Sequence, residues 1–313
     1  MLGFLLRRVV ATIPVMAVVA LFVFSLLYIA PGDPASIIAG DQATPADVER
    51  IRAGLGLDRP FLVRFAEWAW NVLHGDLGIS IFSNLPVSKL IGQRLEPTFS
   101  LMILTLLLAI IVAVPIGVLA AWLHGTWVDR LLMALAVLGF SVPVFVVGYM
   151  LSYVFALQLD MFPVQGYTPL SSGFWPWLNN LVLPTVALAG VYIALIARIT
   201  RATMLEVLSQ DYIRTAKAKG VSGRTVLFLH ALKNAAVPVV TVIGLGVALL
   251  IGGAVVTESV FAIPGLGRLV IDAILRRDYP IIQGVTLLFA FVYVLVNLGV
   301  DVLYTLFDPR IRY

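Results

Sequence analysis

The chain has 313 residues, of which 61% are hydrophobic and 12% are charged, and its mean hydropathy is +1.02. A soluble domain of this length could not bury so much apolar surface, so the composition indicates an integral membrane protein. Cysteine is absent, which excludes disulfides, thiol catalysis and thiolate metal sites. The net charge of +4 reflects an uneven distribution of Lys and Arg between loops, so it does not indicate nucleic-acid binding.

Six apolar segments are long enough to cross a bilayer core, which requires about 17 to 25 residues. They comprise residues 9–30, 99–123, 131–157, 181–197, 237–257 and 281–307. The sequence therefore predicts an all-α integral membrane protein with six transmembrane helices. Its first apolar run is too long for the core of a signal peptide and no small-x-small cleavage site follows it, so we expect this run to remain as the first span.

Lys and Arg concentrate in loops on the cytoplasmic side of a membrane protein. With the N-terminus inside, the inner segments are 1–8, 124–130, 198–234 and 308–313, and they hold 12 Lys and Arg against 4 acidic residues. The outer segments hold 9 against 12. This asymmetry predicts that both termini are cytoplasmic.

The outer segment after the first span predicts a small helical cap. Thr44 and Pro45 are typical of a helix start, and a second helix is expected after Pro60. The second helix carries Phe61, Phe65, Trp68 and Val72 on one stripe, which predicts that it lies along the outer membrane interface. We expect the first span and this cap to form residues 1–92, and the remaining five spans to form residues 93–313.

Proline and glycine interrupt the second and third spans. Residues Pro115 and Gly117 lie in the second, and Gly139, Pro143 and Gly148 lie in the third. Broken helices are tolerated where they line a cavity, so both spans are candidates for the walls of a pathway. Ordinary helix kinking is an equally good interpretation.

The longest hydrophilic run between two apolar segments covers residues 198–234. Within it, Leu205, Leu208, Tyr212, Ala216 and Lys219 recur at helical spacing, which predicts one helix with a mostly apolar face. Gly220 is placed to end that helix in a left-handed conformation, and Ser222 is placed to cap a second one. Two helices that meet at a glycine could fit a groove on another protein; the simpler alternative is a basic loop held against anionic lipid.

Three further positions are candidates on general grounds. Small residues Gly244, Ala248 and Gly252 form a ridge that permits close helix packing, within the chain or against a second subunit. Glu258 lies at the outer boundary and is expected to pair with Arg268 or Arg276 rather than with a substrate. Asp301, one turn after Asn297, is an acid inside a span, which makes these two residues possible pathway groups; helix pairing is as good an explanation.

A series of short motifs occurs in a fixed order along almost the whole chain. They are Arg7-Arg8, Pro31-Gly32-Asp33-Pro34, Leu55-Gly56-Leu57-Asp58, Gly75-Asp76-Leu77-Gly78, Arg94-Leu95-Glu96-Pro97-Thr98, Asp211-Tyr212-Ile213-Arg214-Thr215-Ala216, Pro264-Gly265-Leu266-Gly267-Arg268 and Arg277-Asp278-Tyr279-Pro280. With these motifs the chain resembles the membrane-spanning permease subunits of type I ABC importers, in the branch that carries dipeptides, oligopeptides, glutathione and nickel.

The resemblance implies that segment 198–236 contains the coupling loop that ATPase subunits grip. The family's Glu-Ala-Ala triplet falls on Arg214, Thr215 and Ala216, and its glycine on Gly220. The family's later Ile-x-Leu-Pro falls on residues 230–233, where Leu232 matches and His230 and Lys233 depart. The residues expected to contact an ATPase subunit are Ser209, Asp211, Tyr212, Arg214, Thr215, Ala216, Lys217, Lys219 and Gly220. Those expected at an outer gate or binding-protein contact are Glu258, Pro264, Gly265, Gly267 and Arg268.

The resemblance also implies the partners: a second homologous permease, forming a heterodimer, two ATPase subunits and an extracytoplasmic binding protein, in a bacterial inner membrane. ATP and magnesium are expected on the ATPases, because this chain lacks a phosphate-binding loop, a metal-ligand cluster and a nucleophile elbow. A peptide-like solute is favoured over nickel, since no His-rich or Met-rich pathway is visible. An ion-coupled secondary transporter and an intramembrane enzyme are the alternatives of other classes.

Overall fold

The computed structural model describes residues 2–29, 33–39, 43–54 and 56–307. Within these ranges the regular structure is helical, apart from an isolated β-bridge between Ile79 and Pro86. Five helices are long and apolar enough to cross a membrane, or six if one bent pair counts as a single span. The predicted all-α membrane fold is therefore confirmed. Pro31 and Gly32, which begin one of the motifs, and the predicted inner segment 308–313 lie outside the described residues.

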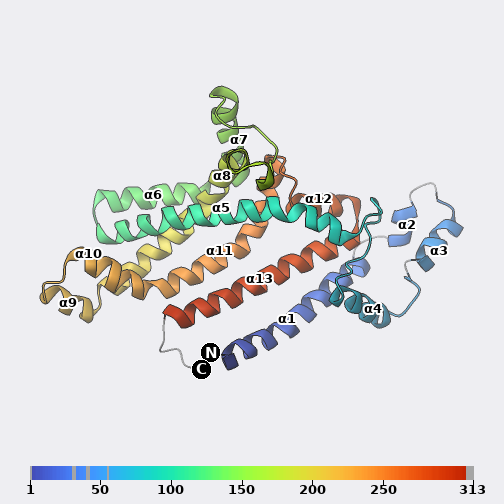
Figure 1. The fold of residues 1–313 in the computed structure, drawn as a ribbon, viewed down its shortest axis with the longest axis horizontal. Helices are drawn as coiled ribbons and strands as arrows, with labels where there is room; N and C mark the ends of the chain where they lie inside the picture. Colours follow the sequence, from blue (N-terminus) through green and yellow to red (C-terminus); the bar gives the residue numbers. More distant parts are fainter. Residues whose placement is uncertain (1, 30–32, 40–42, 55, 308–313) are drawn as a thin grey trace. The chain divides into compact units, whose positions relative to one another are not determined.

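The helices follow one another along the chain as Figure 1 labels them. They are α1 (Leu2–Ile29), α2 (Pro34–Ala39), α3 (Pro45–Gly54), α4 (Phe61–Leu73), α5 (Val87–Trp122), α6 (Trp127–Ser141), α7 (Val144–Leu151), α8 (Phe174–Leu208), α9 (Asp211–Ala218), α10 (Gly223–Thr225), α11 (Lys233–Val260), α12 (Leu266–Arg276) and α13 (Tyr279–Phe307). Two π-helical segments, Ser152–Gln158 and Val226–Leu232, and a 3-10 turn, Leu170–Ser172, complete them.

By their contacts these elements divide into two compact units. Unit 1 comprises residues 1–94 and 269–294, and unit 2 comprises residues 95–268 and 295–313. Helices α5, α12 and α13 contribute residues to both units. The expected domain boundary between residues 92 and 93 stays a prediction.

In unit 1 the predicted cap consists of α2, α3 and α4. Thr44 begins α3 as expected, because its hydroxyl accepts the Asp47 N–H at 3.3 Å and donates to the Asp47 carboxylate at 2.6 Å. On α4 the Phe61 and Trp68 rings of the predicted aromatic stripe pack on Phe24 of α1, with centroids 5.4 and 5.3 Å apart. The residues of the stripe are half-buried, and these aromatic contacts hold α4 against α1. That the helix lies along the outer membrane interface stays a prediction.

Two sequence motifs of unit 1 meet although they are about 200 residues apart in the chain. Ser80, just after the Gly75-Asp76-Leu77-Gly78 motif, donates to the Asp278 carboxylate at 2.6 Å. Asp278 is 2% exposed and also accepts the Ile81 N–H at 3.3 Å. Gly78 has a φ of +84°, which suits glycine, and its N–H donates to Asp76 at 2.8 Å. These two motifs therefore build one buried polar joint.

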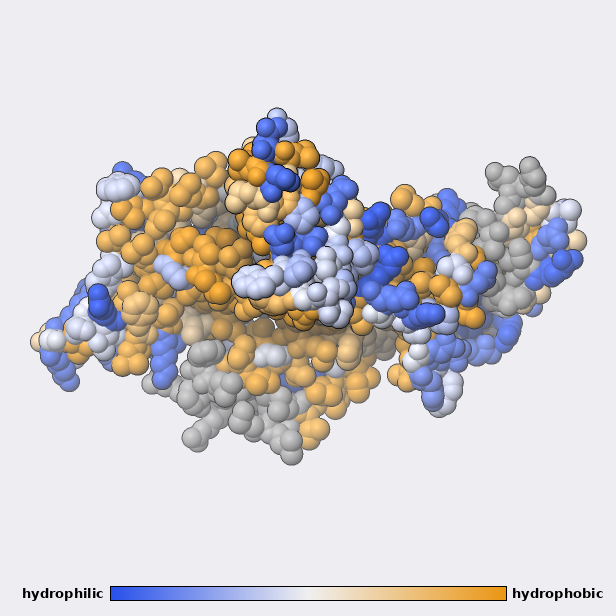
Figure 2. Space-filling view, turned by 45° about the horizontal axis from the view of Figure 1, so that its top comes forward, coloured by the Kyte–Doolittle hydropathy of each residue, from blue (hydrophilic) through white to orange (hydrophobic). Residues whose placement is uncertain are grey.

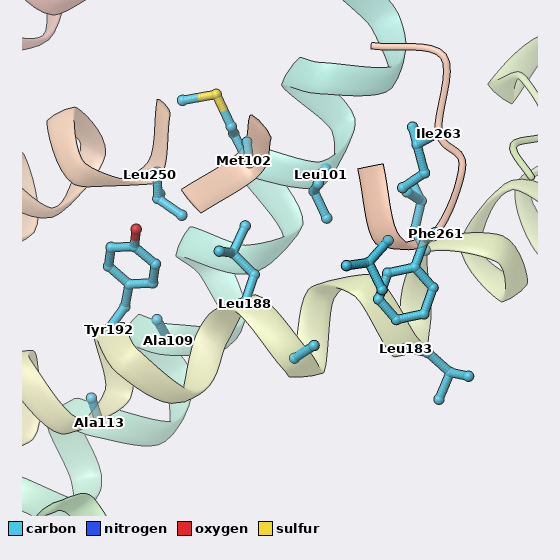
Figure 3. Packing of buried hydrophobic residues seen from close by; sticks show 14 of the residues in the cluster. Leu101, Met102, Ala109, Ala113, Leu183, Leu188, Tyr192, Leu250, Phe261 and Ile263 are labelled. Atoms are coloured by element: carbon cyan, nitrogen blue, oxygen red, sulfur yellow. The ribbon is translucent and has the colours of Figure 1, made fainter. Parts of the chain in front are cut away.

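Helix α8 is the centre of unit 2 and contacts α6, α7 and α11. Figure 3 shows Leu101 of α5, Leu188 of α8 and Leu250 of α11 in one buried cluster. Glycines permit the close approach of neighbouring helices to α8. A Cβ at Gly117 of α5 would lie 2.7 Å from the Ala197 carbonyl oxygen, and one at Gly139 of α6 would lie 3.0 Å from that of Gly190.

The third predicted span is broken. Helices α6 and α7 meet at an angle of 98°. Pro143 causes the break, because it has no N–H to donate and forces Val142 out of the helical region, to φ −92° and ψ 126°. The interruption predicted for this span is confirmed, whereas α5 continues as one helix through Pro97 and Pro115. That these spans line a pathway stays a prediction.

The fourth and fifth spans are longer than predicted. Helix α8 extends well beyond residues 181–197 at both ends, and α11 continues an unbroken helix that begins at Gly223. Hydropathy marks only the apolar centre of such a helix, whereas the polar residues at its ends keep the same backbone hydrogen bonds. Much of segment 198–236, which was predicted to form two separate helices, therefore belongs to the ends of these two long helices.

Candidate functional site

The polar end of unit 2 carries a short helical hairpin, residues 209–222, which we call the inner hairpin. It contains α9 and joins α8 to the helix that begins at Gly223. Figure 1 shows α9 and α10 at one end of the unit, and Figure 2 shows hydrophilic residues gathered there beside the apolar helices.

The inner hairpin differs from the prediction in how it begins. One helix was expected to run from Leu205 to Lys219, but Gln210 has an extended conformation, with φ −70° and ψ 148°, and separates α8 from α9. Ser209 closes α8 by donating its hydroxyl to the Glu206 carbonyl at 2.7 Å. The break rotates α9, so Tyr212 is 45% exposed and Ile213 is the buried residue. The helical spacing of the residues in the sequence could not reveal this break.

The end of α9 is as predicted. Gly220 has a φ of +79°, and the next N–H, of Val221, donates to the Ala216 carbonyl at 3.1 Å. This six-to-one bond is a Schellman motif, which satisfies carbonyls that the helix leaves free. Ser222 then caps the following helix, because its hydroxyl accepts the Thr225 N–H at 3.3 Å. The turn between the two helices is therefore fixed by its own hydrogen bonds.

Buried residues anchor the inner hairpin to the bundle. Ile213 of α9 and Val226 of the following π-helical segment are each 0% exposed, and these two elements contact each other. A Cβ at Gly223 would lie 3.1 Å from the ring of Trp122, at the end of α5. The start of the second helix is therefore seated closely on α5.

The residues predicted to contact an ATPase subunit lie in α9 or directly beside it, on the accessible surface of the inner hairpin. Ala216 is half-buried and Gly220 is exposed, and so are the others: Ser209, Asp211, Tyr212, Arg214, Thr215, Lys217 and Lys219. Arg214 and Asp211 approach to 3.6 Å, with side chains 78% and 97% exposed. Such a pair contributes at most about 1 kcal/mol, so both charges remain available to a partner.

A buried ion pair ties α6 to α8 near the same end. Arg201 donates from Nε to one oxygen of Asp129 at 2.6 Å and from Nη2 to the other at 2.8 Å. The Asp129 side chain is 4% exposed and also accepts the Gly125 N–H at 3.1 Å. His124 contributes its Nδ1 at 3.3 Å. Bidentate geometry of this kind fixes orientation as well as energy, so the two helices are clamped together. No pattern in the sequence indicates this pair.

Two sequence motifs meet in a buried network around Glu258: one contributes Thr98, and the other contributes Leu266 and Arg268. Its carboxyl group is 0% exposed, accepts the Thr98 hydroxyl at 2.5 Å and accepts the Arg268 N–H at 3.0 Å. Thr98 in turn accepts the Leu266 N–H at 2.8 Å. The first turn of α12 is thus capped by two side chains that are distant in sequence. We call these residues the outer network.

Glycine is required beside this carboxyl group. A Cβ at Gly265 would lie 2.2 Å from the Glu258 carboxyl, and one at Gly267 would lie 2.6 Å from the Val255 Cα. Glu258 accepts the backbone N–H of Arg268, and its predicted pairing with the side chain of Arg268 or Arg276 stays a prediction. The gate or binding-protein contact predicted for Glu258, Pro264, Gly265, Gly267 and Arg268 stays a prediction.

The small-residue ridge of α11 divides into two parts. A Cβ at Gly244 would lie 2.4 Å from Val300 of α13, whereas Gly252 is exposed with open space around it. Ala248 is half-buried between them. Packing within the chain therefore uses Gly244, and the second-subunit role of the ridge stays a prediction.

Asn297 is exposed, Asp301 is half-buried, and both take part in polar interactions, so their proposed pathway role also stays a prediction. Among the described residues, no group of three or more His, Cys, Asp and Glu side chains could hold a metal ion.

Long apolar helices joined by a capped, polar hairpin define a multi-pass membrane protein. The model of the family described as binding-protein-dependent transport system inner membrane component matches residues 113–313, and the model of its N-terminal region matches residues 1–102. The chain belongs to this family. It is therefore the permease of an ABC importer in a bacterial inner membrane, and such systems include ATPase and substrate-binding protein partners.

The relatives that are similar in sequence match over almost the whole chain. A probable peptide ABC transporter permease of Sinorhizobium fredii is 58% identical over 310 residues, which cover 99% of both chains. The glutathione transport system permease of Salmonella typhimurium is 42% identical over 313 residues, which cover 100% of both. Among solved structures, the inward-facing MetNI methionine ABC transporter has a TM-score of 0.58 at 16% identity, over 70% of this chain and 96% of that one. This last likeness shows the fold.

Proposed function

We propose that this permease moves a peptide-like solute inward, namely a dipeptide, an oligopeptide or glutathione, and that the inner hairpin transmits the motion of an ATPase subunit. The observation that carries the proposal is the construction of α9: it is capped at Gly220, anchored at Ile213 and polar on its outer face. A segment fixed in this way moves as a rigid body when a partner pulls it. The names of the relatives support the substrate class; nickel or another small solute is the alternative.

In this proposal ATP and magnesium bind to two separate ATPase subunits, and this chain itself catalyses no reaction. A second homologous permease completes a heterodimer, with the exposed Gly252 part of the ridge facing it. An extracytoplasmic binding protein delivers the solute to the outer face, near the segment that contains Pro264 and Arg268. ATP binding closes the ATPases, and the inner hairpins then tilt α8 and α11 between inward-open and outward-open states.

The test is the ATPase rate of the purified assembly in lipid, with and without its binding protein. We expect the binding protein to stimulate ATP hydrolysis, most strongly when it is loaded with a peptide or glutathione. Uptake of the solute down an ion gradient without any ATPase subunit would instead show an ion-coupled secondary transporter. If only the Ni²⁺-loaded binding protein stimulates ATP hydrolysis, the protein is still an ABC importer permease but its substrate is nickel.

A further inference from the structure

An open groove of ≈ 360 Å³ lies between α6 and α8 in unit 2. Helix α6 contributes Met133, Val137 and Phe140, which recur at helical spacing along one stripe. Helix α8 contributes apolar residues, including Leu195, and then two cations, Arg198 and Arg201. The groove is therefore apolar along its length and positively charged at one end.

The two arginines at this end differ in their partners. Arg201 is committed to Asp129 by the bidentate bonds described above, and the carboxylate neutralises its charge. Arg198 is exposed and makes no side-chain hydrogen bond or ion pair within the described part of the chain. One uncompensated positive charge thus remains at the mouth of the groove.

The depth of Arg198 in the membrane follows from its neighbours. Asp129 lies in the first turn of α6, so its partner Arg201 is level with the cytoplasmic start of that helix. Trp127 in the same turn is 72% exposed, as is common for aromatic residues at a membrane interface. Arg198 precedes Arg201 by three residues, which places it about 4.5 Å deeper along α8. From this depth its long side chain can extend back to the interface and reach the lipid phosphates of the cytoplasmic leaflet.

We propose that this groove binds an anionic glycerophospholipid of the cytoplasmic leaflet. The guanidinium of Arg198 binds the phosphate, and one acyl chain lies along Met133, Val137 and Phe140. Basic pockets between transmembrane helices on the cytoplasmic side bind anionic headgroups in this way. A lipid with one net negative charge complements the single free cation, whereas a choline group would bring a second positive charge next to it.

The first test compares two arginine variants of the purified full assembly. Arg130 is exposed and lies in the first turn of α6 outside the groove, so R130Q removes the same charge from the same leaflet and serves as the control. Binding of phosphatidylglycerol and phosphatidylcholine is titrated by native mass spectrometry. We expect R198Q to bind phosphatidylglycerol about tenfold more weakly than R130Q, which is the effect of losing one charge-assisted hydrogen bond. Equal binding by the two variants would overturn the proposal.

The second test asks what occupies the groove in the assembled transporter. The chain has no cysteine, so a Val137→Cys variant accepts a single fluorescent label when it is assembled with cysteine-free partner subunits. Brominated phosphatidylglycerol should quench this label more than brominated phosphatidylcholine does, and adding R198Q should abolish the difference. A label that neither lipid quenches, and that cross-links to another subunit, would show that the groove is a protein interface and would refute the proposal. Neither test requires transport activity, so its outcome is separate from that of the proposed function.

Discussion

The outer network predicts that two threonines on one helix respond differently to the same substitution. Thr98 and Thr105 both lie on α5 and are 1% and 0% exposed. The Thr98 hydroxyl donates to Glu258 at 2.5 Å and accepts the Leu266 N–H at 2.8 Å. The Thr105 hydroxyl has no hydrogen-bond partner among the described residues. Valine keeps the branched shape in both cases and replaces only the hydroxyl.

At Thr98 the change to valine removes the bond to Glu258 and leaves the buried Leu266 N–H unpaired. Each of these effects costs about 1–3 kcal/mol, and because they overlap we expect a loss of about 3 kcal/mol in the free energy of unfolding. At about 2 °C per kcal/mol for a large domain, the unfolding temperature of Thr98→Val should fall by about 6 °C. Thr105→Val removes an unpaired polar atom, so it should change stability by less than about 0.5 kcal/mol or raise it.

The assay is thermal unfolding of the purified permease in detergent, followed by tryptophan fluorescence. Thiol-reactive dyes are unsuitable because the chain has no cysteine, whereas its 6 tryptophans provide the signal. Equal shifts of the unfolding temperature in the two variants would refute the reasoning, since burial and shape change alike in both and only the hydrogen bonds differ.

Three further substitutions test other parts of the chain. Gly220→Val should abolish co-purification of the ATPases, because a β-branched residue at φ +79° costs more than the roughly 1–2 kcal/mol of the left-handed conformation. Gly220→Asn should retain most of the co-purification, and equal behaviour of the two variants would favour a loop held by charge alone. Asp129→Asn should lower the free energy of unfolding by about 3–5 kcal/mol, because it leaves the charge of Arg201 without its partner. Adding Arg201→Met should recover part of this loss in thermal unfolding, and no recovery would argue against that reason. Gly244→Ala should destabilise the isolated chain by about 1–3 kcal/mol, because the added methyl group clashes with α13. Gly252→Leu should affect only co-purification with a second permease, and the opposite pattern would place the interface between the permeases elsewhere.

Much of the architecture could be predicted from the sequence, because apolar length and turn chemistry are local properties. The apolar runs predicted the spans, Thr44 predicted the start of α3, and Gly220 and Ser222 predicted the turn of the inner hairpin. Pro143 likewise predicted the break between α6 and α7. In each case one residue type strongly prefers one backbone conformation, whatever surrounds it.

The features that could not be predicted depend on pairs of residues far apart in the chain. Glu258 caps α12 together with Thr98, which is 160 residues away in the chain. The clamp between Asp129 and Arg201 was missed because nothing local joins those positions. The extended Gln210 also escaped prediction, since this residue has no strong preference and the surrounding period favours a continuous helix.

The uninterrupted length of α8 has a mechanical consequence. A helix of 35 residues is a stiff beam of about 52 Å, and a swing of only about 5° about one tip would displace the other tip by roughly 4.5 Å. The inner hairpin is attached at one tip, and Trp177, which donates to Ser100 at 3.2 Å, lies near the other. If an ATPase subunit docks on the inner hairpin as proposed, a small rotation of α8 there would shift its far tip enough to open or close a passage for a small solute.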